Sequence, residues 1–179
     1  RARYDGVSIE MSSIWFSGSA NLFSHEFYQL VRARLRPGGV LQQWIQLHHI
    51  APEEVVSVLR TAREVFPYVS LWEIGRQGIV LASDRPQSIT PDAIARLRTT
   101  PALARDLGLM EQLDGFTIEQ IESRLVLSHS DLDRVLDIAR ARRIPVSTDA
   151  NRYLEFATPR HNLESRRTVE ATTSALLGL

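Results

Sequence analysis

The stretch HEFYQLVRARLRPGGVLQQWIQL, residues 25–47, joins a predicted helix to a predicted strand and decides the fold class. Apolar residues repeat at helical spacing after Ser24, which suits a helix N-cap; they are Phe27, Leu30, Val31 and Leu35. The sequence RPGG ends that helix, because proline cannot continue it and glycine accepts the positive φ of a C-cap. Residues 40–47 then form a near-continuous apolar run, which is typical of a strand buried on both faces, as in a parallel sheet.

Similar elements flank this stretch on both sides. YDGVSIEM, residues 4–11, is a short β-branched and apolar run that predicts a strand. Residues 52–66 predict a helix that begins at Pro52, and YVSLWEI and GIVLAS predict an antiparallel hairpin over residues 68–83. This order predicts an α/β fold with parallel strands and a closing antiparallel edge. We expect the first strand to be central in a complete sheet whose first half lies outside this chain.

Near residue 89 the sequence changes from alternating strand and helix patterns to mainly helical patterns. Helical patterns cover residues 91–98, 117–126, 130–143 and 163–179, and a short strand is expected near residues 152–157. We therefore divide the chain into residues 1–88, the second half of a Rossmann-like domain, and residues 89–179, a helical extension or cap.

Composition excludes several functions. The 21 basic residues balance the 21 acidic ones, so no net charge attracts nucleic acid or an anionic membrane. Lysine and cysteine do not occur, which excludes lysine Schiff bases, disulfides, thiolate nucleophiles and Cys-type zinc sites. No apolar run approaches the roughly 20 residues that span a bilayer. We expect a soluble cytoplasmic chain, or the cytoplasmic domain of a membrane protein.

Candidate site residues gather where the predicted strands end. Glu10 follows the first strand, and α/β sites lie at the carboxyl ends of parallel strands. Alternation places Gln42, Trp44 and Gln46 on one side of the next strand, and Gln46 is nearest its carboxyl end. His48 is a candidate substrate contact. We expect no metal, because neighbouring histidines of an extended chain point to opposite sides.

For the other candidate site residues, a functional and a purely structural interpretation both remain open. Ser12 and Ser13 fit a loop or turn as well as a binding site. Trp15 suits either stacking on a ligand or core packing, and Trp72 either a ligand contact or edge-strand packing.

The quoted segments resemble the spermidine synthase family, the polyamine aminopropyltransferases. The resemblance is carried by YDGVSIEMSS, by NLFSHEFYQLVRARLRPGGVLQQW and by FPYVSLWEIGRQGIVLASDRP, and it covers residues 4–86 and, less closely, 145–160. The chain resembles the C-terminal half of the family's domain. Within the family it resembles the bacterial branch in which this domain is fused to a membrane region. The resemblance implies a Rossmann-like sheet of the S-adenosylmethionine methyltransferase type.

The implied reaction is aminopropyl transfer from decarboxylated S-adenosylmethionine, the co-substrate, to a polyamine such as putrescine. Glu10 falls where the family has its first loop aspartate, the proposed base, and the second loop aspartate has no counterpart. Six residues would shape the acceptor pocket: Ser12, Ser13, Trp15, Gln46, His48 and Trp72. Residues that bind the co-substrate are expected in the half of the sheet outside this chain.

Two other functions remain open. The chain fits a non-catalytic Rossmann-like module of a larger protein, a membrane protein included, and it fits an S-adenosylmethionine-dependent methyltransferase with another acceptor. In each case an exposed strand edge predicts pairing with the missing half or self-association into an oligomer.

Overall fold

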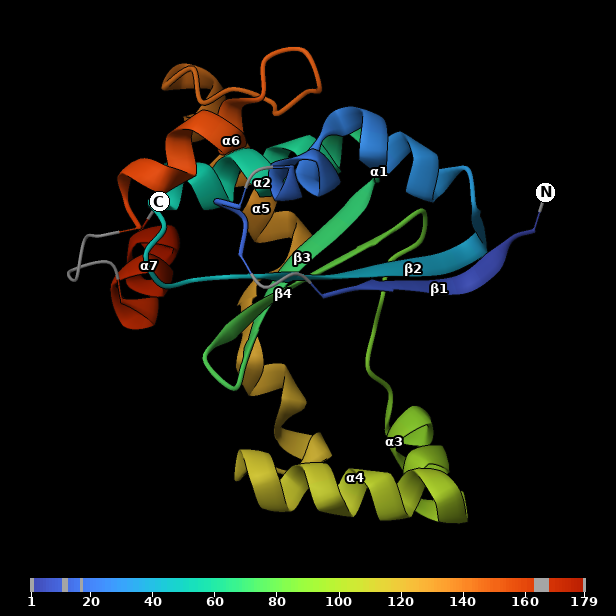
Figure 1. Cartoon of the computed structure of the whole chain (residues 1–179). Coiled ribbons are helices and arrows are strands. Elements are labelled where there is room, and N and C mark those ends of the chain that lie inside the picture. Colours follow the sequence, from blue (N-terminus) through green and yellow to red (C-terminus); the bar gives the residue numbers. More distant parts are fainter. Residues whose placement is uncertain (1, 11–12, 17, 163–167, 179) are drawn as a thin grey trace.

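The computed structural model describes residues 2–10, 13–16, 18–162 and 168–178, and a five-stranded sheet forms its centre (Figure 1). The strands are β1 (Tyr4–Ile9), β2 (Leu35–Ile45), β3 (Tyr68–Ile74), β4 (Gln77–Ser83) and β5 (Leu125–Leu127). Their order in space is β1-β2-β4-β3-β5; β1 is parallel to β2, and all other neighbours are antiparallel. This mixed α/β arrangement is consistent with a Rossmann-like fold.

Strand β1 lies at an edge of the sheet that this chain forms, and the expected central position refers to a complete sheet with further strands. Its only strand partner among the described residues is β2, and most of its side chains are exposed. Position within a sheet depends on which distant segments pair, and an apolar run alone does not report this. The expected pairing of the free edge of β1 with further strands stays a prediction.

Strand β2 begins earlier than the sequence predicts. Helix α1 (His25–Arg32) ends before the RPGG sequence, and Pro37, Gly38 and Gly39 lie inside β2, where its register with β1 shifts. Gly38 has a φ of 81°, and a Cβ on Gly39 would lie 3.0 Å from the carbonyl oxygen of Arg36. The two glycines therefore permit an irregular strand instead of a helix end.

The predicted hairpin is confirmed, with a two-residue turn. Gly75 and Arg76 both have positive φ, 57° and 64°, as in the tight turns whose twist matches that of the flanking strands. Gly78 follows in β4, where a Cβ would lie 2.6 Å from Cγ2 of Ile45. Only glycine therefore allows β4 to approach the end of β2 this closely.

One face of the sheet is covered by helices. Helices α1 and α2 (Pro52–Val65) pack on it, and Ser24 is the N-cap of α1, because its Oγ accepts a hydrogen bond from the amide of Phe27 at 3.2 Å. On this face the buried hydroxyl of Tyr28 donates a hydrogen bond to Oε1 of Gln43 at 2.8 Å. The covered face includes Leu41, Ile45, Leu71, Val80 and Ala82, all buried. These side chains form the main core.

Three later helices complete the same core. They are α5 (His129–Ala141), α6 (Tyr153–Ala157) and α7 (Val169–Leu177), and they contribute Leu132, Leu154 and Leu176. Two short 3-10 helices, η1 (Ser19–Phe23) and η3 (Thr158–Arg160), border this layer. None of the described helices combines the length and apolar character that crossing a bilayer requires.

The opposite face of the sheet is turned toward a helical arm, residues 89–124. The arm contains α3 (Pro91–Thr99), α4 (Pro101–Asp114) and the 3-10 helix η2 (Ile118–Arg124), and Figure 1 shows α3 and α4 on the side opposite α1, α2 and α6. Arg98 joins its parts, with ion pairs of 2.7 Å to Glu111 and 2.7 Å to Glu119.

Two predicted elements are wrong in type. The helix expected over residues 117–126 is the 3-10 helix η2 followed by the short strand β5. The strand expected near residues 152–157 is helix α6, because Oδ1 of Asn151 accepts the amide of Tyr153 at 3.0 Å and turns the chain at that point. Helix α7 occupies part of the helical pattern expected over residues 163–179, of which residues 163–167 and 179 lie outside the described ones. The division of the chain near residue 88 stays a prediction.

Candidate active site

A cavity of about 860 Å3 lies between the sheet and the helical arm. The sheet contributes the apolar side chains Trp44, Trp72, Ile74, Ile79 and Leu81, and the arm contributes Ile89 and Ile121. Three polar side chains complete the lining: Glu10, Gln42 and Gln77. A volume of this size is in the range of roughly 300–1,000 Å3 that small-molecule sites occupy.

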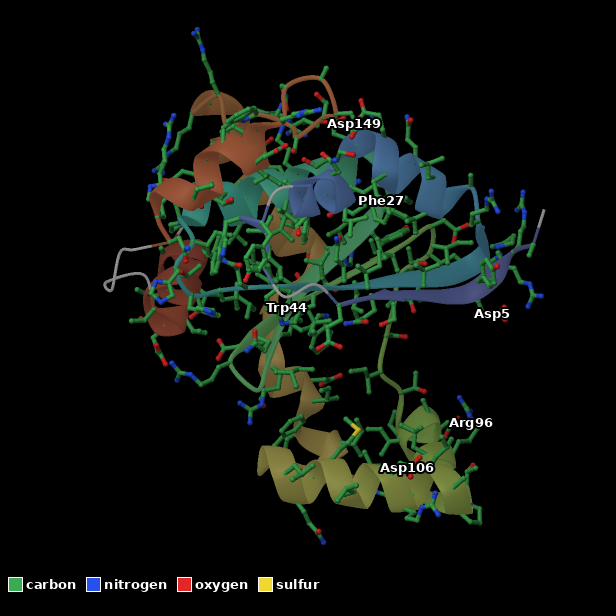
Figure 2. All side chains as sticks on the ribbon, in the orientation of Figure 1. Asp5, Phe27, Trp44, Arg96, Asp106 and Asp149 are labelled. Carbon is green, nitrogen blue, oxygen red and sulfur yellow. The ribbon has the colours of Figure 1, made fainter. Side chains whose placement is uncertain are left out.

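Strand register explains why these side chains meet. Trp44 of β2 lies opposite Ile79 of β4, and Ile79 in turn lies opposite Trp72 of β3. Adjacent strands are about 4.8 Å apart, so the two tryptophans stand roughly 10 Å apart in one row across the sheet. Figure 2 shows Trp44 on the side of the sheet that faces away from Phe27 of α1.

The same register places Glu10 at one end of this row. Ser8 pairs with Gln42 and Ile9 with Gln43 in the parallel ladder, so Glu10 comes beside Trp44 just after β1 ends. Glu10 is exposed at the cavity wall, and its carboxylate has no hydrogen bond or ion pair with any described residue. It is therefore available to a ligand.

The other polar side chains of the cavity wall each make a hydrogen bond to a neighbouring side chain. The Oε1 atom of Gln42 accepts a hydrogen bond from the hydroxyl of Ser8. The indole N–H of Trp44 donates to Oε1 of Gln77 at 2.9 Å, and the indole N–H of Trp72 donates to Oγ of Ser70 at 2.9 Å. The two indoles thus present their apolar ring surfaces to the cavity.

Of the predicted site residues that the structure describes, Glu10 and Trp72 line this cavity, and the others are not part of its lining. Gln46 is buried beyond the end of β2, where its Oε1 accepts the amide of Ile14 and its Nε2 donates to the carbonyl oxygen of His48, both at 3.2 Å. Ser13 is buried in the loop that follows β1, and Trp15 of that loop is half-buried beside the ring of Phe16. Ser12 lies outside the described residues. A ligand role for these residues stays a prediction.

His48 follows β2 and is half-buried. Burial, together with the neighbouring imidazole of His49 and guanidinium of Arg76, lowers the pKa of His48. His49 stands edge-on to it with a φ of 53°, a left-handed conformation that histidine adopts more readily than most residues. Neither imidazole lines the cavity. Within the part of the chain that the structure describes, no three potential ligands converge in a metal site.

The sequence prediction omits several residues of the cavity wall. Gln42 and Trp44 were visible in the alternation of β2, but Gln46 was preferred because it is nearer the carboxyl end. Gln77, Ile79 and Leu81 belong to β4, and no local pattern shows that β4 pairs with β2.

The fold and the site define a mixed α/β protein with a cavity on the uncovered face of its sheet. A carboxylate that has no partner among the described residues follows a parallel strand, and the cavity beside it is otherwise mainly apolar. No model of a known protein family matches the sequence.

The chain is 34% identical over 89 residues to polyamine aminopropyltransferase 2 of Pseudomonas aeruginosa. The match covers 45% of this chain and 26% of that protein. The chain therefore spans about a quarter of the length of the curated relative it matches. The match supports a distant relationship between this chain and proteins of the spermidine synthase type.

Proposed function

We propose that this protein is a spermidine synthase-like transferase that moves an aminopropyl group from decarboxylated S-adenosylmethionine to an amine acceptor of the polyamine type. The observation that carries the proposal is the position of Glu10, an unpaired carboxylate at the wall of a cavity beside the end of a parallel strand. The similarity to a polyamine aminopropyltransferase supports the same reaction.

The sheet also supports the proposal. A parallel pair, β1 and β2, is followed by an antiparallel hairpin whose second strand lies next to β2. This arrangement is compatible with the later half of a methyltransferase-type sheet, the layout that the resemblance implies.

The chemistry assigns a simple task to Glu10. The acceptor amine is protonated in water, and its nitrogen must lose a proton before its lone pair can attack the propyl carbon bound to sulfur. As the C–N bond forms, the C–S bond breaks and its electron pair stays on sulfur, which becomes a neutral thioether. The Glu10 carboxylate receives the amine proton and, until then, stabilises the ammonium.

The test compares Glu10 with another glutamate of the sheet. The full-length natural protein is incubated with decarboxylated S-adenosylmethionine and a panel of amines, and products are identified by mass spectrometry. General-base catalysis contributes about 100- to 10,000-fold, so Glu10→Gln is expected to lower kcat/KM by at least about 100-fold. Glu73→Gln is the matched control, because Glu73 lies next to Trp72 in β3 and does not line the cavity.

Two outcomes would contradict the proposal. The first is the absence of an aminopropylated product with every amine tested. The second is full activity of Glu10→Gln. A methylated product from S-adenosylmethionine itself would favour the methyltransferase instead.

A further inference from the structure

We infer that the ring face of Trp44 binds the ammonium group of the polyamine that keeps its positive charge, while the reacting nitrogen gives its proton to Glu10. This inference rests on the proposed function, because it assigns a second substrate contact in the same cavity. It follows from the position of Trp44 beside Glu10, from the hydrogen bond that holds its indole, and from the chemistry of an indole face.

Glu10 and Trp44 are neighbours on the same face of the sheet. Ser8 pairs with Gln42 in the ladder of β1 and β2, and its hydroxyl donates to Oε1 of Gln42, so these two side chains lie side by side on one face. Side chains of a strand alternate between faces, so the residues two positions further on return to that face. Those residues are Glu10 and Trp44, and both line the cavity. They are separated by about one strand spacing, roughly 4.8 Å.

The indole of Trp44 is held by its polar edge. Its Nε1–H donates a hydrogen bond of 2.9 Å to Oε1 of Gln77, in β4. Strand β4 comes this close to β2 because Gly78 has no Cβ, which would lie 2.6 Å from Cγ2 of Ile45. Since the N–H of the ring is occupied, a ligand in the cavity meets the ring face.

An indole face suits an ammonium group that must stay protonated. The face carries the negative part of the ring quadrupole, and among aromatic side chains tryptophan attracts cations most strongly. The indole has no acceptor for a proton, whereas the Glu10 carboxylate, which has no partner among the described residues, can accept one. A polyamine that lies across both side chains would therefore lose a proton only at the nitrogen next to Glu10.

The test measures binding by calorimetry to the full-length natural protein, in the absence and presence of 5′-methylthioadenosine, the thioether that remains after aminopropyl transfer. The probes are putrescine and 4-amino-1-butanol, which has the same chain length and a hydroxyl group in place of one ammonium. A cation–π contact changes affinity by about 3- to 30-fold, so putrescine should bind more tightly than the amino alcohol by this factor.

Variants locate the second ammonium. Trp44→Leu keeps an apolar side chain without a ring and should remove the preference for putrescine, whereas Trp44→Phe keeps a ring face and should retain part of it. Phe156→Leu is the matched control, because Phe156 lies outside the cavity lining and is 64% exposed on α6. The two probes are compared within each variant, and circular dichroism verifies folding, so a partial loss of folded protein does not imitate the effect.

Steady-state kinetics give a second readout. Trp44→Leu should raise KM for putrescine by about 3- to 30-fold and leave kcat nearly unchanged, because the contact is the same before and during the reaction. Glu10→Gln should instead lower kcat, because it removes the base.

The results separate this inference from the proposed function. The inference is overturned if 4-amino-1-butanol binds as tightly as putrescine, or if Trp44→Leu keeps the full preference. If an aminopropylated product forms in that case, the transferase proposal holds and the role of Trp44 fails. If the preference depends on Trp44 and no amine is aminopropylated, the ammonium site holds and the transferase proposal fails.

Discussion

Replacing Glu54, at the start of α2, is expected to lower the stability of the whole domain. Its side chain is only 1% exposed. Oε2 accepts the amide of Ala51 at 2.9 Å, and Oε1 lies 2.7 Å from Nδ1 of His161, in the segment after η3. Because Ala51 has no side chain that can cap the helix, Glu54 satisfies a buried amide that would otherwise have no acceptor.

The cost of Glu54→Leu can be worked from these two bonds. A buried amide left without an acceptor costs about 1–3 kcal/mol, and a hydrogen bond to a charged group contributes about 1.5–3 kcal/mol. His161 is partly exposed and keeps some hydration, so we expect the lower part of the sum, about 3 kcal/mol. In a protein of this size that free energy lowers Tm by about 6–12 °C. Glu54→Gln keeps an acceptor and a similar volume, so about 1 kcal/mol is expected.

The assay is urea unfolding followed by circular dichroism, with Glu53→Leu as the matched control. Glu53 is the preceding residue of the same helix and is exposed, so its substitution should change the free energy of unfolding by less than about 0.5 kcal/mol. The reasoning is refuted if Glu54→Leu unfolds within about 0.5 kcal/mol of the natural protein, or if Glu53→Leu is equally destabilising.

Three further predictions concern the arm, the hairpin and the free edge. Hydrogen bonds from Arg98 lower the pKa of Glu119 to about 2, so its contribution to stability is complete above its ordinary pKa of about 4.3 and is lost as the pH falls toward 2. The fall in Tm between pH 5 and pH 2, relative to Arg98→Gln, measures the combined contribution of Glu119 and of Glu111, whose pKa Arg98 also lowers, and equal slopes would contradict it. Gly78→Ala should destabilise by about 1–3 kcal/mol in urea unfolding, because its Cβ overlaps Ile45; an unchanged midpoint would show that β4 can shift. If the edge of β1 pairs with another chain, Tyr4→Lys should lower the molar mass found by light scattering, and a monomer before substitution would contradict the pairing.

The local elements were predictable from sequence because their signals are local. The spacing of apolar residues identified α1 and α2, and alternation identified the hairpin. Strand β5 was missed because it contains few residues and only Leu127 is buried in it. Helix α6 was mistaken for a strand, since its apolar residues are too few to show a helical period.

The candidate site was predictable only in part. Glu10 could be located because it follows a strand directly, whereas the row that it borders depends on long-range pairing. Trp44 and Trp72 come together only because β4 lies between β2 and β3. No periodicity within either strand contains that information, so the apolar character of the cavity appears only in the folded chain.

The ion pairs of Arg98 connect the cavity to the surrounding solution. Ile118 donates its amide to the Glu111 carboxylate that Arg98 holds, at 2.7 Å, and Ile121 lies one turn further along η2 in the cavity wall. Salt weakens pairs between partly exposed charges. Ionic strength therefore acts on the contacts that hold η2, the segment that contributes Ile121 to an otherwise mainly apolar wall.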